Sequence, residues 1–371
     1  MRLKVRPADF RVEEVLEPPP PEPAGAFAIY RVSKRRLPAL EAVARLASLL
    51  GVAARDVQFA GLKDARAETT QLASVKLAAG RGLPRPEAAP DLVLEPLHRA
   101  ARPVDRRRLV ANRFALVVRD LGPVEVAALP LRLEALLRDG LPDYFDDQRL
   151  GGESPERGFV AGRLAEGRLE EALRLQIAHP SPKDPRLERL EKKAIAARFG
   201  QWAEIAGDVK GEAAPIVRRL ARAPNDILGA FAALDLRLRA LIVARFQSWL
   251  WNEEVARRLH AELPAGRRFE VMYRGGSLVF WRALEDGERT RLAAARVPWP
   301  AVTVPPRLGV RPARGDRALL VRPGGLEAAA DEPDEAFPGR RKVALRFTLP
   351  RGSYATLVAK RLFYEPEAPR S

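Results

Sequence analysis

No cysteine occurs among the 371 residues, and this absence limits how the chain can be stabilised and what chemistry it can carry. It excludes disulfides, thiolate zinc sites, iron–sulfur clusters and a cysteine nucleophile. The three histidines, His98, His179 and His260, are far apart and show no HExxH or HxE spacing, so we expect no metal site and no histidine-based triad. With 47% apolar residues, the chain has to fold around an apolar core, in roughly two or three domains.

The chain is strongly basic, with a formal net charge of +16. A polyphosphate partner favours such an excess, because bound phosphates release their counterions. Basic residues concentrate in three stretches, 31–36, 99–108 and 183–193. The alternative is the ion-pair surface of a heat-adapted protein, since the second and third stretches also contain acids and the chain has 33 prolines and two methionines. Charge alone favours a nucleic-acid partner, and the composition also predicts thermostability.

The sequence predicts a cytoplasmic protein without a membrane segment. It contains no run of roughly 18 uncharged apolar residues, and residues 1–10 lack the apolar region of a signal peptide. It also contains no GxxxxGK[ST] motif and no strand–GxGxxG–helix pattern, so we expect no nucleotide cofactor. Catalysis, if present, falls to carboxylates, lysines and hydroxyls.

The first part of the chain alternates between strand and helix patterns. We expect strands around residues 10–13, 26–32, 57–60, 71–77 and 109–119. One helix is predicted over 40–50, ended by Gly51, and another over 124–138, ended by Gly140. The spacing is not that of a doubly wound sheet, so we predict an α+β fold with a mostly antiparallel sheet.

The composition changes in the middle of the chain and then returns to a strand pattern. Residues 153–262 are rich in helix formers, and 241–259 predicts a buried helix. Residues 343–349 alternate as a strand, and a last helix follows from Tyr354. This pattern suggests that the middle of the chain is an insertion and that the C-terminal segment completes the sheet of the first part.

The stretch QFAGLKDARAETTQ, residues 58–71, places Lys63 and Asp64 on a tight loop between two predicted strands. Gly61 permits an unusual backbone angle, so the loop can hold Asp64 at a fixed height above the sheet. A nearby cation would keep the carboxylate ionised, as a nucleophile or general base requires. Taken alone, a solvated surface turn explains the same residues, because Gly and Asp are ordinary turn formers.

GLKDARAETTQ resembles the signature of the TruD family of tRNA pseudouridine synthases. Further segments match the family in the same order: LKVRPADFRVEE, ANRFALVVRDL, PDYFDDQRLGG, FQSWLWN and FTLPRGSYAT. Six ordered matches over nearly the whole chain are far more specific than any one of them, and they outweigh the surface-turn alternative.

The resemblance implies an isomerase that detaches uracil from C1′ of a tRNA uridine, rotates it and reattaches it through C5, without a metal or an organic cofactor. It assigns catalysis to Asp64, with support from Lys4 and Lys63, and we expect Lys4 to pair with Asp64 across the sheet. Phe145 is expected to stack on the flipped base. Asp143, Gln148 and Arg149 are expected at the RNA-binding site. The family implies uridine 13 of tRNA as the target.

Two departures from the family pattern concern the PDYFDDQRLGG segment. Asp143 stands where the family has Asn, and Asp146 where it has Gly. A second carboxylate near Asp64 would impair its ionisation, unless Lys4 or Arg149 offsets Asp143 or the Asp143 side chain turns away.

The resemblance also implies a catalytic domain formed by 1–155 and 336–371, with an inserted α+β domain over 156–335. We expect the inserted domain to close an RNA-binding cleft, with the 183–193 stretch facing phosphate. Two other functions stay open at this point. An RNA uridine methyltransferase would need a cofactor loop and, for chemistry at C5, a cysteine. A non-catalytic RNA-binding factor with the same fold would not depend on Asp64. The sequence leaves the oligomeric state open.

Overall fold

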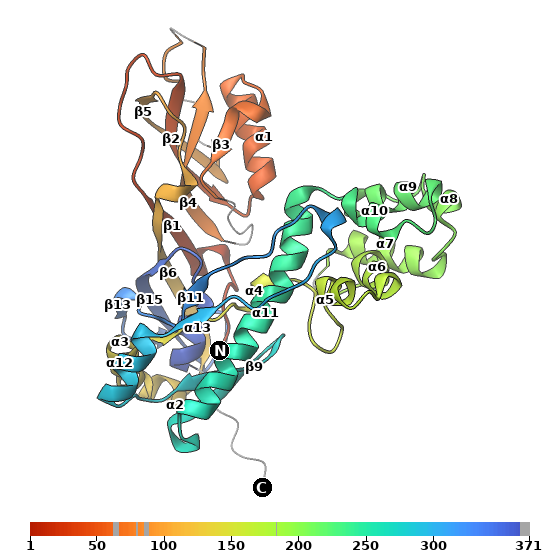
Figure 1. The fold of residues 1–371 in the computed structure, drawn as a ribbon. Helices are drawn as coiled ribbons and strands as arrows, with labels where there is room; N and C mark the ends of the chain where they lie inside the picture. Colours follow the sequence, from red (N-terminus) through yellow and green to blue (C-terminus); the bar gives the residue numbers. More distant parts are fainter. Residues whose placement is uncertain (62–66, 79–80, 85–88, 183, 364–371) are drawn as a thin grey trace. The chain divides into compact units, whose positions relative to one another are not determined.

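The computed structural model describes residues 1–61, 67–78, 81–84, 89–182 and 184–363. The chain divides into two compact units (Figure 1). The first unit comprises Met1–Leu141 and Val321–Ser371, and the second comprises Pro142–Leu320. The second unit is therefore inserted in the sequence between the two parts of the first unit. Its limits are earlier than the predicted 156–335, and the predicted domain assignment itself stays a prediction.

A nine-stranded sheet forms the first unit, in the order β13-β15-β6-β1-β4-β2-β5, with β14 beside β15 and β3 beside β4. Its strands are β1 Phe10–Leu16, β2 Phe27–Arg35, β3 Val57–Phe59, β4 Glu68–Lys76, β5 Leu92–Ala100, β6 Leu109–Leu121, β13 Gly324–Ala328, β14 Glu332–Pro333 and β15 Arg341–Pro350. Within the described ranges, β1 and β4 are the one parallel pair of this sheet. The predicted α+β fold with a mostly antiparallel sheet is confirmed, and β15 completes the sheet by pairing with β6 as expected.

The helices of the first unit are α1 Ala39–Leu50, α2 Pro123–Ala127, α3 Leu129–Asp139 and α13 Ala355–Phe363. Leu46 of α1 packs with Tyr30 and Val75 of the sheet in one buried cluster, so α1 covers part of one sheet face. Gly51 ends α1 with a φ of 58°, as predicted.

The predicted single helix over 124–138 is wrong, because α2 ends at Ala127 and α3 begins at Leu129. Pro130 lies in the first turn of α3. Proline has no N–H to continue a helical ladder, and it is tolerated only where the first turn needs none. The periodicity of the apolar residues continues through this junction, which is why the pattern alone missed it. Gly140 does follow the last residue of α3.

A buried ion-pair network joins distant parts of the first unit. Arg119 of β6 donates through Nε and Nη2 to the two carboxylate oxygens of Asp9, at 3.0 and 2.9 Å. Its Nη1 donates to Asp334 at 2.9 Å. Asp9 belongs to the N-terminal family motif, and its role here is this contact. The network stabilises the attachment of the N-terminal segment and of the returning C-terminal segment to β6.

The second unit is mainly helical, with two small strand pairs. Its elements are α4 Asp147–Leu150, α5 Val160–Ala165, α6 Leu169–Ile177, α7 Arg186–Ala197, α8 Trp202–Ile205, α9 Ala214–Arg222, α10 Ile227–Ala232, α11 Leu236–Glu262, α12 Asp286–Ala294, β8 Arg268–Tyr273, β9 Gly276–Trp281, β10 Arg296–Pro298 and β11 Asp316–Ala318. The two strand pairs are β8 with β9 and β10 with β11. The long helix α11 buries Trp251, Val255 and Leu259, which confirms the predicted buried helix.

Short elements complete the chain. They are the strands β7 Leu141–Pro142 and β12 Leu320–Val321, and the 3-10 helices η1 Pro7–Asp9, η2 Ala54–Asp56, η3 Arg106–Arg108, η4 Gly211–Ala213, η5 Ala265–Arg267 and η6 Pro306–Leu308. Of the helices in the described part of the chain, none combines the length and apolarity that a bilayer crossing requires.

Candidate active site

Polar side chains are buried on the sheet face that α1 partly covers. This buried polar cluster consists of Glu14, Lys34, Thr69, Gln71 and Asn112, each at most 8% exposed. Side chains alternate between the faces of a strand, so the register decides which of them meet. Thr69 lies opposite Lys34 on β2, and Glu14 lies opposite Asn112 on β6. Lys34 donates from Nζ to the Leu37 carbonyl at 2.7 Å. Buried polar groups at the centre of a sheet are unusual and mark this face as a candidate site.

The start of the Lys63–Asp64 loop contacts this cluster. Gln71 donates from Nε2 to the Gly61 carbonyl oxygen at 3.2 Å. A Cβ added to Gly61 would lie 3.3 Å from Oε1 of Glu14. Gly61 does not have a positive φ, so the reason predicted for this glycine is wrong. The requirement is the close approach of the Glu14 carboxylate. Lys63 and Asp64 themselves lie outside the described residues.

Two buried oxygens of the cluster have no hydrogen-bond partner among the described residues, Oγ1 of Thr69 and Oε1 of Gln71. Both residues belong to the loop signature and are 2% exposed. A buried polar atom left without a partner costs about 1–3 kcal/mol. A fold tolerates this cost more readily where the polar atoms serve a site than in a purely structural core.

Lys4 precedes β1 and has an unusual conformation. Its φ is 57°, a left-handed value that a lysine rarely adopts. Its Nζ lies 4.2 Å from the centroid of the Phe10 ring, a cation–π distance. The predicted pairing of Lys4 with Asp64 involves a residue outside the described ranges and stays a prediction.

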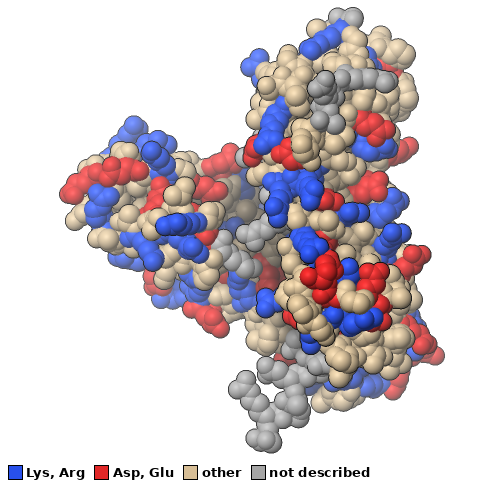
Figure 2. Space-filling view, turned by 180° about the vertical axis from the view of Figure 1, so that it is seen from behind, with Lys and Arg blue, Asp and Glu red and all other residues tan. Residues whose placement is uncertain are grey.

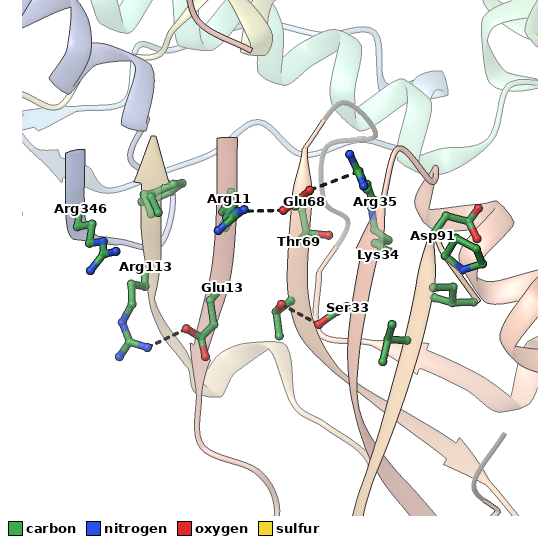
Figure 3. Close-up of a pocket in the computed structure, with 17 residues that line it drawn as sticks. Arg11, Glu13, Ser33, Lys34, Arg35, Glu68, Thr69, Asp91, Arg113 and Arg346 are labelled. Carbon is green, nitrogen blue, oxygen red and sulfur yellow. Dashed lines mark hydrogen bonds and ion pairs between the residues drawn. The ribbon is translucent and has the colours of Figure 1, made fainter. Parts of the chain in front are cut away.

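The opposite sheet face carries a cavity of about 600 Å³. Residues of the alternate register line most of it, and Lys34 and Thr69 of the buried polar cluster also belong to its lining (Figure 3). Charged residues there form cross-strand pairs. Arg11 and Arg35 both contact Glu68, at 2.9 and 3.4 Å, and Arg113 contacts Glu13 at 2.7 Å. Exposed ion pairs of this kind contribute little to the stability of the fold and are typical of a solvated sheet face. We therefore place the candidate active site on the face with the buried polar cluster.

The second unit holds the residues predicted to bind the base. Phe145 is 4% exposed and lies against two tryptophan rings, with centroid distances of 5.6 Å to Trp251 and 5.5 Å to Trp299. Its backbone is fixed by Asn252, which accepts from the Phe145 N–H at 2.9 Å and donates to the Phe145 carbonyl at 2.7 Å. Asn252 belongs to the FQSWLWN motif, so that motif orients the PDYFDDQRLGG segment.

Tyr144 anchors the same segment on its other side. Its hydroxyl donates to the Val279 carbonyl at 3.1 Å, and burial raises its pKa well above 10.0, so it stays a neutral donor. Gln148 is exposed. Arg149 donates from Nε to the Ser248 hydroxyl at 3.0 Å. The carboxylate of Asp146 accepts from the Asp147 N–H at 2.8 Å and caps α4, which explains the acid at this position.

Arg317 of β11 is the functional candidate that sequence reasoning missed. Its Nη2 lies 2.6 Å from Oδ2 of Asp143, and its guanidinium lies 4.4 Å from the Phe145 ring centroid. Lys4 and Arg149 were the cations expected near Asp143, and the carboxylate contacts Arg317. It is 174 residues away in the chain and belongs to no recognised motif, so no sequence signal indicated it.

The described residues include no group of three or more His, Asp or Glu side chains arranged to hold a metal ion. Lys4 and the buried polar cluster lie in the first unit, and Asp143, Phe145, Gln148, Arg149 and Arg317 lie in the second.

Comparison with known proteins identifies the family. The sequence model of tRNA pseudouridine synthase D (TruD) matches residues 1–280. The tRNA pseudouridine synthase D of Geobacter metallireducens is 30% identical, covering 96% of this chain and 93% of the relative. That of Aquifex aeolicus is 26% identical and covers 98% of both chains. The crystal structure of the TruD protein of Methanosarcina mazei, 24% identical, superposes with a TM-score of 0.67 over 98% of this chain and 93% of that one, which supports the fold. This chain belongs to the TruD family, tRNA pseudouridine synthase D.

Proposed function

We propose that this protein converts uridine 13 of tRNA to pseudouridine with Asp64 as the catalytic carboxylate. The observation that carries the proposal is the family match over residues 1–280, a range that includes the complete GLKDARAETTQ signature. Membership makes the protein an isomerase that acts on tRNA. The target position, the catalytic residue and the roles of its neighbours are what we add.

The reaction conserves every atom of the nucleotide. The bond between C1′ and N1 breaks, a bond between C1′ and C5 forms, C5 loses its proton and N1 gains one. An ionised Asp64 either attacks the sugar or the base, or removes a ribose proton, and each route requires the carboxylate form. The protein also has to hold the free base while it rotates. Lys4 and Lys63 would favour the charged form of Asp64.

The contacts around Gly61 support this assignment. A catalytic side chain on a loop needs a rigid support, because small errors in position cost large factors in rate. Gly61 lies three residues before Asp64 and is held by Gln71 against the Glu14 carboxylate. These residues come from three different strands or their ends, so the sheet itself sets the position at which the loop begins.

Phe145 is proposed to stack on the flipped base, and its environment adds a condition. With 4% of the residue exposed, the ring offers no free face of the size of a base. Stacking on Phe145 therefore requires a neighbouring side chain to move. Two guanidinium groups lie near the ring, that of Arg317 at 4.4 Å from its centroid and that of Arg149 at 5.6 Å.

The target position can be tested with a transcript of a tRNA that carries uridine at position 13. Carbodiimide-stop mapping should show one enzyme-dependent stop at that position, and a transcript with cytidine there should show none. An enzyme-dependent stop elsewhere would move the target but keep the activity. Binding of the tRNA without any stop would favour the alternative, a non-catalytic RNA-binding factor.

We also propose which basic residues contact tRNA phosphates. Figure 2 shows Lys and Arg spread over one face of the protein with Asp and Glu among them, so charge density alone does not identify the surface. The three basic stretches differ in how many of their residues form ion pairs. In the first, Lys34 is buried and Arg35 pairs with Glu68. In the third, Lys192 pairs with Asp184 and Glu188, at 2.9 and 2.7 Å, whereas Arg186, Arg189 and Lys193 make no ion pair with another described residue.

The second stretch is different. Arg102, Arg106, Arg107 and Arg108 are exposed, and none makes an ion pair with another described residue. Arginines without a carboxylate partner can give up water and counterions to a phosphate without first breaking a salt bridge. We therefore add this stretch as a candidate for phosphate contact beside the predicted 183–193 stretch, whose role stays a prediction.

Changing Arg106, Arg107 and Arg108 to Gln should weaken tRNA binding and reduce the slope of log Kd against log salt by about 2–3, since each phosphate contact contributes about 0.7–0.9. A variant with Arg186, Arg189 and Lys193 of α7 changed to Gln removes the same formal charge and provides the comparison. Filter binding at several salt concentrations measures both. A larger loss of slope in the α7 variant would favour the 183–193 stretch instead.

Cytoplasmic location and thermostability stay predictions from the sequence.

A further inference from the structure

We propose that Arg317 is a positioning residue of this enzyme: it neutralises Asp143, the acid that replaces the family asparagine, and thereby fixes Phe145. The inference rests on the proposed role of Phe145 and extends it to Asp143, which departs from the family pattern, and to Arg317, which lies in none of the matched motifs.

Arg317 makes three close contacts with residue 143. Nη2 lies 2.6 Å from Oδ2 of the carboxylate, and both Nε and Nη2 donate to the main-chain carbonyl of Asp143 at 3.1 Å. The side chains are only 15% and 10% exposed, so water screens the pair weakly. A guanidinium that binds both the side chain and the backbone of one residue fixes the position of the chain there.

The same guanidinium covers the aromatic ring two residues further on. Its carbon lies 4.4 Å from the Phe145 centroid and 5.5 Å from that of Trp251. These are cation–π distances. One planar group therefore joins Asp143, Phe145 and α11, so a change in the charge at residue 143 acts directly on the side chain that covers the ring.

The strand pair that carries Arg317 is itself held to α11. Arg317 lies opposite Val297 in the pairing of β11 with β10, and Trp251 donates from Nε1 to the Val297 carbonyl at 3.3 Å. Gln247 donates to the carbonyls of Pro300 and Ala313, each at 2.9 Å, and accepts from the Ala313 N–H. Gln247 and Asn252 come from one motif, and they hold the two sides of the Arg317–Phe145 contact.

Charge explains why the pair belongs together. A buried carboxylate without a cation is strongly unfavourable, whereas an asparagine at the same position carries no charge and needs none. With Asp at position 143, an arginine beside it becomes necessary. With Asn there, the arginine would keep its contacts with the main chain and the ring but would lose its electrostatic purpose. The two positions are therefore predicted to be energetically coupled.

A double-mutant cycle tests this coupling. The variants are Asp143→Asn, Arg317→Gln and the combination of both, with Arg317→Lys as the variant that keeps the charge but loses the planar group. Each is assayed for kcat and KM with tRNA, for tRNA affinity and for its unfolding midpoint. The Trp fluorescence of the cluster around Phe145 reports local packing.

Arg317→Gln alone should lower kcat by about 100-fold or more, because it removes the guanidinium that contacts the buried carboxylate of Asp143. Asp143→Asn alone should lower kcat less than Arg317→Gln does, and adding it to Arg317→Gln should recover at least about tenfold. Arg317→Lys should fall between these values. We expect the losses in kcat rather than in KM, because the positioned base matters during the chemical step.

Three results would overturn the proposal. Arg317→Gln could lower kcat by the same factor in both backgrounds, which would make Arg317 independent of Asp143. It could leave kcat unchanged, which would remove any role in the reaction. The loss could also be accounted for entirely by the unfolded fraction, which would make the pair purely structural. If the original enzyme forms no pseudouridine, the proposed function fails instead, and the cycle on stability and fluorescence still tests the coupling.

Discussion

Changing Asp64 to Asn should reduce pseudouridine formation by about 10⁴-fold or more, the scale of loss seen when an enzyme loses the group that forms or breaks bonds. Asparagine has nearly the same shape as aspartate but can neither attack as an anion nor accept a proton. Single-turnover assays on a tRNA with uridine at position 13 measure the rate, and carbodiimide-stop mapping identifies the product position.

Binding provides the control for this variant. The Asp64→Asn protein should bind tRNA within about threefold of the original, since removing one negative charge from a polyanion site does not weaken association. Asp64→Glu keeps the charge but moves the carboxylate by one methylene, and we expect it to remain at least about 100-fold impaired because the reacting atoms have to be aligned. Activity above a tenth of the original in Asp64→Asn would assign catalysis to another residue.

Changing Arg119 to Met should lower the free energy of unfolding of the first unit by about 3–5 kcal/mol, because it leaves the buried carboxylates of Asp9 and Asp334 without their cation. For a unit of this size the unfolding midpoint would fall by roughly 6 to 20 °C. Arg113→Met is the matched control, since Arg113 lies on the same strand and pairs with Glu13 in an exposed position. Loss of the exposed Arg113–Glu13 pair should lower the free energy of unfolding by at most about 1 kcal/mol.

The pH dependence gives a second measurement of the same network. Burial opposes the charged form of Asp334, but hydrogen bonds from the N–H groups of Asp120 and Ala336 and from Arg119 prevail and lower its pKa below 3.8. Hydrogen bonds from Arg119 and Lys342 lower the pKa of Glu335 below 4.5. Both shifts stabilise the fold above those ordinary values and are lost as the pH falls below them. The original protein should therefore lose stability as the pH falls below about 4.5 and then 3.8. In Arg119→Met, the free energy of unfolding should fall less steeply with decreasing pH. Equal slopes would contradict this account.

The sequence predicted most of the secondary structure because local patterns determine it. Alternation identified β1 and β15, and the apolar periodicity together with Gly51 identified α1. It failed at the junction of α2 and α3, where the periodicity continues but Pro130 interrupts the backbone ladder. It also gave the wrong reason for Gly61, since the approach of Glu14 depends on how β1 and β4 pair.

The candidate site was only partly accessible from the sequence. Motif order identified Asp64, Lys4 and Phe145 as candidates, and it raised the question of a cation for Asp143. The answer, Arg317, depends on a contact between β11 and a segment 174 residues earlier in the chain. No periodicity, composition or spacing encodes such a contact, because it arises from the packing of both segments against α11.

By itself, the sequence determined six strands of the main sheet, the helices α1, α11 and α13, the family, the basic character and the chemical groups available for catalysis. These follow from side-chain period, composition and motif order, which are properties of neighbouring residues. The tertiary structure alone decided which polar side chains share a buried face, which arginine neutralises Asp143, and which basic stretch is free of ion pairs. These depend on strand register and on the contacts of distant segments, where desolvation makes the charge of each partner matter.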